Sequence, residues 1–260
     1  MFQTLGKGSR LIIIPTFIFF LFAAARYLNI IVLFPHLNQN GIVHSTDVNV
    51  AGALNDPPQQ SNKNMDSKTR EALDFVLNNV IRPDYNSPYS LEDESRRDFS
   101  QFKEVPGLHK KFFNLKRDGF FIESGAFQGE HLSNSLQLER DFGWRGILVE
   151  PMPSNFEILK RKNRKAFSLQ ACLDDVQGVV ERQMYDRKGY GASLFEKAAG
   201  QGKKPVNVKC VSVAALLSAL HVKHVDWIWL DVEGGEMAVL RSFPWDYVTV
   251  DLLQVLFSAI

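Results

Sequence analysis

The chain has 260 residues, which is enough for one domain with extensions. Hydrophobic residues make up 45% and charged residues 23% of the chain, a globular composition that excludes a wholly disordered protein. The net charge of +1 gives no electrostatic reason to expect a nucleic-acid partner. Cys172 and Cys210 are too few for a disulfide framework, so they form either one bridge in an oxidising compartment or two buried thiols. Because the chain has neither a CxxC nor an HExxH motif, we predict no metal site.

The N-terminus has the pattern of a membrane-targeting segment. Lys7 and Arg10 precede an apolar run over residues 11–25, and further apolar residues extend it to Phe34. The first run has the length of a signal peptide, whereas the longer one, about 24 residues, is long enough to span a bilayer. We therefore expect residues 1–34 to form a single-pass transmembrane helix or a cleaved signal helix.

The charges around this segment predict its orientation. Positive residues lie mostly on its N-terminal side, which predicts a cytoplasmic N-terminus and a lumenal C-terminal domain. We accordingly expect a protein of the secretory-pathway membranes, in the endoplasmic reticulum or Golgi, with the endosome or plasma membrane as further locations.

Three regions follow the N-terminal segment. Residues 35–66 are rich in Asn, Gln, Pro and Ser and predict a flexible linker. Residues 67–118 form a helical lead-in, with one helix capped by Asp66 or Ser67 and a second, shorter helix over residues 104–115. Residues 119–260 contain the α/β domain.

Strands and helices alternate from Gly119 onward, which is typical of a doubly wound parallel sheet. We expect a capping box of Ser154 and Glu157 to open the second helix. The predicted strands cover residues 119–123, 146–149, 167–173, 225–230 and 248–255, with an antiparallel pair, 179–184 and 206–211, inserted. The predicted helices cover residues 132–142, 154–164, 213–220 and 236–243.

Ligands of such sheets bind beyond the carboxyl ends of the strands, and the first of these ends carries a carboxylate and two glycines. Glu123 closes the strand, and Gly125 and Gly129 allow a tight turn with close backbone approach to a ligand. The G-x-x-x-G spacing lacks the G-x-G-x-x-G of a dinucleotide site, which argues against NAD and fits a ligand with an amino-acid group. A purely structural turn is the alternative.

Further carboxylates follow the other strands. Glu150 ends the second strand and is placed to accept hydrogen bonds from ribose hydroxyls, or else it is a solvated loop residue. Asp174 follows the third strand, either at an adenine amino group or in a plain turn. Asp231 and Glu233 follow the most apolar strand and either contact the substrate or cap the next helix. The cations between Lys160 and Lys165 crowd a helix C-terminus, where they complement the helix dipole.

Four stretches in order resemble the motifs of FkbM-type methyltransferase domains. They read FIESGAFQGE, LVEPMPSNFEIL, ACLDD and WLDVEGGEMAVL, and the resemblance covers about residues 119–255. Finer features, such as LSNSLQLER and KNRKAFSLQACL, are similar to the metazoan branch related to the arthropod protein Star. The resemblance implies a Rossmann-like fold of the S-adenosylmethionine (SAM) methyltransferase type.

The resemblance also implies residue roles and two alternative functions. In a SAM-dependent O-methyltransferase, the methionine part of SAM would lie at Glu123, Gly125 and Gly129, with the ribose at Glu150 and the adenine at Asp174. Asp231 and Glu233 would then border the methyl acceptor as catalytic residues. A Star-like protein would instead assist the export of EGF-receptor ligands or similar cargo from the endoplasmic reticulum.

The C-terminus departs from the family pattern. The last predicted strand runs directly into residues 256–260, so we expect a C-terminally shortened domain that lacks the last two strands of a seven-stranded methyltransferase sheet. We therefore expect an exposed, apolar edge strand.

Overall fold

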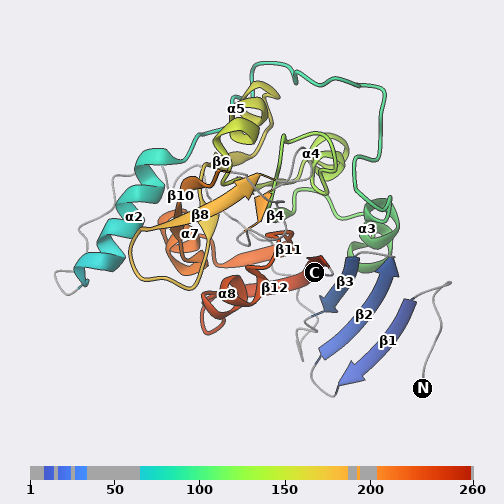
Figure 1. Ribbon diagram of the computed structural model, residues 1–260. Helices are drawn as coiled ribbons and strands as arrows, with labels where there is room; N and C mark the ends of the chain where they lie inside the picture. Colours follow the sequence, from blue (N-terminus) through green and yellow to red (C-terminus); the bar gives the residue numbers. More distant parts are fainter. Residues whose placement is uncertain are drawn as a thin grey trace.

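The computed structural model describes residues 9–14, 17–24, 27–33, 65–186, 192–193 and 204–258 (Figure 1). Its centre is a sheet of five parallel strands. If these five are numbered by their order in the chain, they lie side by side in the order 5-4-1-2-3. In that spatial order the strands are β12 (Thr249–Ser258), β11 (His224–Leu230), β4 (Phe120–Ser124), β5 (Arg145–Val149) and β6 (Phe167–Leu169). The strand order reverses between β4 and β11, which is the switch point of a doubly wound sheet. The predicted Rossmann-like α/β fold is therefore confirmed.

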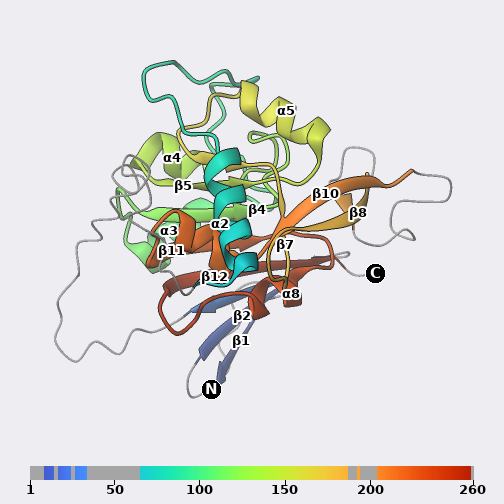
Figure 2. The same cartoon turned by 90° about the vertical axis from the view of Figure 1, so that its left-hand side faces the viewer.

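Helices cover both faces of this sheet, because successive strand residues point to opposite sides. Ile122 and Ile147 belong to one buried cluster, while their neighbours Phe121 and Leu148 belong to another. The first cluster contacts α2 (Ser67–Asn79), α7 (Val213–Ala219) and α8 (Glu236–Arg241). The second contacts α3 (Val105–Phe113), α4 (Leu136–Phe142) and α5 (Pro153–Arg161). Figure 2 shows α2 lying across the first face.

A smaller four-stranded sheet stands beside the central one (Figure 2). Its order is β7 (Cys172–Leu173), β10 (Val206–Val211), β8 (Val180–Asp186) and β9 (Ala192–Ser193). The antiparallel pairing of β8 with β10 confirms the predicted inserted pair. Cys172 and Cys210 face each other in register across β7 and β10 and form a disulfide. Of the two alternatives for these cysteines, the structure has the bridge.

Two local predictions are wrong. Helix α5 begins after Met152 with no side-chain cap, so Ser154 and Glu157 lie inside the helix and form no capping box. Pro153 opens the helix, because its fixed φ suits the first position and its missing N–H needs no partner. The third predicted strand is divided into β6 and β7, which belong to different sheets.

The N-terminal segment also differs from the prediction, because it forms strands and no helix over its described residues. β1 (Ser9–Ile14), β2 (Phe17–Ala24) and β3 (Tyr27–Leu33) are joined antiparallel, and β3 pairs antiparallel with β12 (Figure 1). Ile, Phe and Val favour strands, and β12 offers an unpaired row of N–H and C=O groups. The predicted helix and the predicted exposed edge are therefore both wrong.

Three further predictions concern the membrane span, the linker and the start of α2. Within the described ranges, no helix is both long and apolar enough to cross a bilayer. The predicted linker lies outside the described residues except for Met65 and Asp66. Asp66 caps α2 as predicted, because its carboxylate accepts hydrogen bonds from the N–H groups of Lys68 and Thr69.

Candidate functional site

A pocket opens at the carboxyl ends of the central strands, next to the switch point between β4 and β11. The space between its walls is about 900 Å³, a volume that includes the part open to solvent. Five of the seven predicted site residues line it: Gly125, Glu150, Asp174, Asp231 and Glu233. Segments from β4 to β11, far apart in the chain, thus meet at one cavity.

The floor of the pocket is the contact between Gly125 and Asp231. Gly125 has a φ of +86°, and a Cβ at this position would collide with the backbone carbonyl oxygen of Asp231. The N–H of Asp231 donates to the carbonyl of Ser124 at 3.0 Å, and the N–H of Gly125 donates to the carbonyl of Val149 at 2.9 Å. Only glycine allows this approach, so the turn after β4 presents bare backbone to the cavity.

Glu150 places a buried carboxylate in the pocket wall. It is 4% exposed, and its two oxygens accept hydrogen bonds from the N–H groups of Met152 at 2.9 Å and Phe127 at 2.8 Å. Burial raises the pKa of this carboxyl to about 7, although both N–H donors favour the ionised form. Oε2 keeps a lone pair for a further donor, and Oε1 also accepts a long hydrogen bond from Nδ2 of Asn155 at 3.5 Å, which a ligand hydroxyl could replace.

The wall at the small sheet combines one carboxylate with sulfur atoms. Asp174 accepts a hydrogen bond from Nε of Arg182 at 2.8 Å and shares the pocket lining with Cys172, Cys210 and Met184. Sulfur side chains are apolar and polarisable, which suits contact with an aromatic ring. This wall can therefore hold a flat ring while Asp174 accepts from its polar edge.

Three residues of the pocket lining have an unfavourable backbone. Phe127, Leu132 and Glu233 have φ values of 50°, 61° and 52°, in the left-handed region that bulky residues rarely adopt. Each such residue costs of order 1–3 kcal/mol, so the conformation persists only where the surrounding structure holds it, and such residues cluster at functional sites.

Glu236, the third carboxylate after β11, is not among the lining residues. Its side chain accepts a hydrogen bond from the N–H of Gly234 at 3.0 Å.

Glu123 and Gly129, the other two predicted residues, lie behind the pocket and do not line it. Glu123 is buried, and its carboxylate accepts from the backbone N–H of Asn134 at 2.7 Å and from the hydroxyls of Ser133 and Ser135. Since Asn134 lines the pocket, Glu123 acts on the cavity through that segment. Gly129, with a φ of +77°, packs against Leu159.

Sequence reasoning missed the part played by Arg164. Its guanidinium is buried, pairs with Glu139 at 3.0 Å, and donates to the Gly129 carbonyl and to the hydroxyls of Ser133 and Ser135. It therefore braces the turn from Gly129 to Ser135 that forms one side of the pocket. The cations after α5 were expected only to complement the helix dipole, and no local signal separates the buried Arg164 from the exposed Lys160 and Arg161.

The comparison with protein families identifies the domain. A family model described as methyltransferase FkbM domain matches residues 123–256, just over half of the chain. The chain belongs to the FkbM methyltransferase family. FkbM methyltransferases are usually SAM-dependent. No curated protein and no solved structure was found to match the chain.

Proposed function

We propose that this FkbM domain is a SAM-dependent O-methyltransferase whose cofactor lies in the switch-point pocket. The observation that carries the proposal is the convergence of Gly125, Glu150, Asp174, Asp231 and Glu233 on one cavity. SAM carries a sulfonium and an ammonium group, so a pocket with several carboxylates offers it favourable electrostatics.

The residues present fit the parts of SAM. Glu150 can accept hydrogen bonds from both ribose hydroxyls, because its oxygens are fixed by two backbone N–H groups. Asp174 lies beside the sulfur-lined wall, where it can accept from the adenine amino group. The turn at Gly125 leaves backbone open to the methionine part. Glu123 is a positioning residue that acts through Asn134.

Asp231 and Glu233 are the candidate catalytic residues. When bound, SAM supplies an electrophilic methyl group. The carboxylates of Asp231 and Glu233 would orient a hydroxyl acceptor for in-line attack, and one of them would accept the hydroxyl proton. Asp231 also borders a second, smaller pocket that contains Glu104, Trp229 and Gln254.

Calorimetry with SAM tests the proposal. We expect binding to the full chain, and we expect Glu150→Ala to weaken it about 10- to 100-fold, because a charged acceptor is lost. Glu157→Ala is the matched control, since the Glu157 side chain is 53% exposed on α5 and away from the pocket lining. No heat at millimolar SAM with folded protein would contradict the proposal.

The disulfide favours a second candidate function in the secretory pathway. Structural disulfides persist mainly in oxidising compartments, and Cys172–Cys210 lies in the pocket wall. We infer that the domain works in the lumen of that pathway, where a Star-like protein would bind and help to export EGF-type ligand precursors. Co-precipitation with such precursors and protease protection in intact vesicles test this role. Digestion of the domain in intact vesicles, or normal cargo export in its absence, would contradict it.

A further inference from the structure

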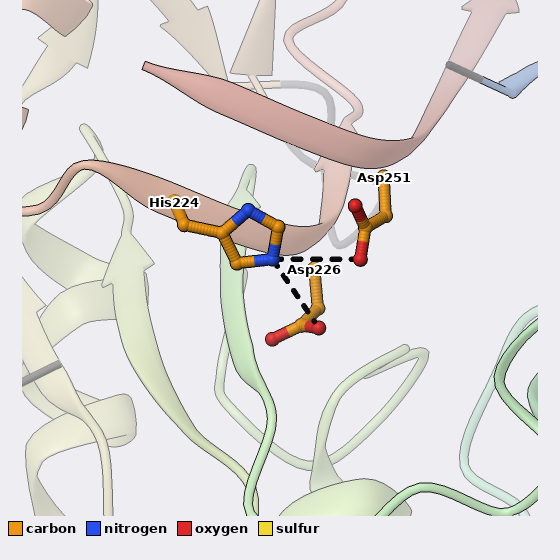
Figure 3. A group of neighbouring side chains, drawn as sticks. All are labelled: His224, Asp226 and Asp251. Carbon is orange, nitrogen blue, oxygen red and sulfur yellow. Dashed lines mark ion pairs between the residues drawn. The ribbon is translucent and has the colours of Figure 1, made fainter. Parts of the chain in front are cut away.

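A group of three ionisable side chains lies at the opposite end of the sheet from the pocket. His224 and Asp226 belong to the first half of β11, and Asp251 belongs to the start of β12 (Figure 3). β11 and β12 are parallel, with His224 opposite Thr249 and Val225 opposite Val250. Residues two apart on a strand share a face, so all three side chains point to the same side.

The distances between the His224 nitrogen and the two carboxylates can be compared with those of a direct hydrogen bond and of a metal site. Nε2 of His224 is 3.5 Å from an oxygen of Asp226 and 3.4 Å from an oxygen of Asp251. A charge-assisted hydrogen bond between nitrogen and carboxylate is about 2.7–2.9 Å long. Two ligands of a tetrahedral zinc ion, each about 2.0–2.1 Å from the metal, are instead about 3.3 Å apart. These two nitrogen–oxygen separations are closer to the second value, and all three ligand atoms lie within 4.8 Å of one another.

The other ring nitrogen of His224 is held by Thr249. Nδ1 lies 2.8 Å from the Thr249 hydroxyl, and that hydroxyl lies 3.5 Å from the carbonyl oxygen of Lys223. The hydroxyl can donate to the carbonyl and accept from the ring, which places a hydrogen on Nδ1. Nε2 then faces two anionic oxygens, where a bare lone pair would be repelled, so a proton or a metal ion must lie between them.

Asp226 is oriented as a metal-ligating carboxylate would be. It is fully buried, and one oxygen accepts from the N–H of Phe120 at 2.7 Å while the other accepts from the Lys116 ammonium at 2.5 Å. Ligating carboxylates are usually held by such outer hydrogen bonds. A divalent cation here would replace the proton on Nε2 of His224 and meet the carboxylates of Asp226 and Asp251.

We propose that His224, Asp226 and Asp251 bind a zinc-type divalent cation, with water as the fourth ligand. Mixed nitrogen and oxygen donors suit zinc, and the His224 and Asp251 side chains are 19% and 32% exposed, which gives the ion and a water access. The ion would clamp β11 to β12 at the end of the sheet remote from the pocket. Its role is therefore structural, and it does not depend on the proposed methyl transfer.

Thermal unfolding of the full chain with added Zn²⁺ tests the site. Chelator-treated, non-reduced protein at pH 8 should bind one Zn²⁺, and its melting temperature should rise by about 5–10 °C at a hundredfold excess over Kd. Asp251→Asn is the decisive variant, because Asp251 is partly exposed and its loss leaves the buried Asp226 paired with Lys116. This variant should fold and lose the zinc effect, and His224→Gln should lose it as well.

Two further measurements separate zinc from its alternatives. Co²⁺ should give the visible absorption of a tetrahedral site in the wild type but not in Asp251→Asn. Glu157→Gln, an exposed acid on α5, should keep the full zinc effect. If Zn²⁺ changes neither melting nor calorimetric heat at pH 8, a proton alone joins the three side chains and the proposal is overturned. An equal zinc effect in Asp251→Asn would overturn it too.

Discussion

The α-carbon of Gly125 lies so close to the backbone carbonyl oxygen of Asp231 that no side chain fits between them. This contact joins the ends of β4 and β11, the two strands between which the strand order reverses. A glycine that sequence analysis assigned to ligand approach therefore has a second use, which is to let two strand-end turns meet and form the pocket floor.

Gly125→Ala should destabilise the protein and abolish SAM binding. The new Cβ must displace the turn after β11, and the φ of +86° disfavours any side chain, so we expect a loss of more than about 2 kcal/mol. Gly107→Ala is the control, because a Cβ there meets nothing within 4 Å and alanine suits helix α3. Denaturant unfolding measures both variants, and equal stability for the two would contradict this reading of the floor.

Glu150 predicts opposite pH dependences for ligand binding and for stability. Ribose hydroxyls need the ionised carboxylate, so SAM affinity should fall about tenfold per pH unit as the pH drops below about 7. The folded protein without ligand holds a proton that the unfolded chain releases, because burial raises the pKa from 4.5 to about 7. Its stability should therefore fall as the pH rises through that window. Calorimetry and unfolding from pH 5 to 8 measure the two trends, and Glu150→Gln should remove both.

Glu123→Ala should lower the free energy of unfolding, although Glu123 does not line the pocket. It would leave two serine hydroxyls and the Asn134 N–H without their acceptor and would remove a buried carboxyl group near Arg164, so we expect a loss of about 3 kcal/mol. Urea unfolding measures the loss, with Glu157→Ala expected to change stability by less than about 0.5 kcal/mol. An unchanged midpoint for Glu123→Ala would show that Glu123 does not support the turn.

Reduction of the Cys172–Cys210 bridge should destabilise the small sheet and the pocket wall. The bridge closes a loop of 38 residues, which corresponds to about 3–4 kcal/mol in the chain-entropy model. Dithiothreitol should lower the melting temperature of the wild type and weaken SAM binding. The double variant Cys172→Ser, Cys210→Ser should already melt at the lower temperature, and dithiothreitol should not change that temperature. If dithiothreitol leaves the melting temperature of the wild type unchanged, the prediction is contradicted.

Sequence alone predicted the parallel sheet because its strands are short apolar runs that alternate with helical patterns. The same logic located Glu150, Asp174, Asp231 and Glu233 at strand ends, since parallel strands finish at one edge of the sheet. These four residues do line one cavity. Whether they hold SAM is the question that calorimetry answers.

Other features depend on contacts between distant residues, which periodicity does not report. The apolar N-terminal run has the length of a membrane helix, yet its β-branched and aromatic residues pair with the free edge of β12. Arg164 lies in a run of exposed-looking cations, but its partner Glu139 is 25 residues away. His224 and Asp251 come together only because β11 and β12 pair in register.

The left-handed backbone at Phe127, Leu132 and Glu233 also has an evolutionary consequence. Glycine or asparagine would lower the conformational cost at each position, so a loss of selection on the cavity would remove one constraint on the larger residues there. A lineage that abandoned the chemistry should accumulate such replacements at these three positions first. It should retain Gly125 all the while, because folding itself requires it.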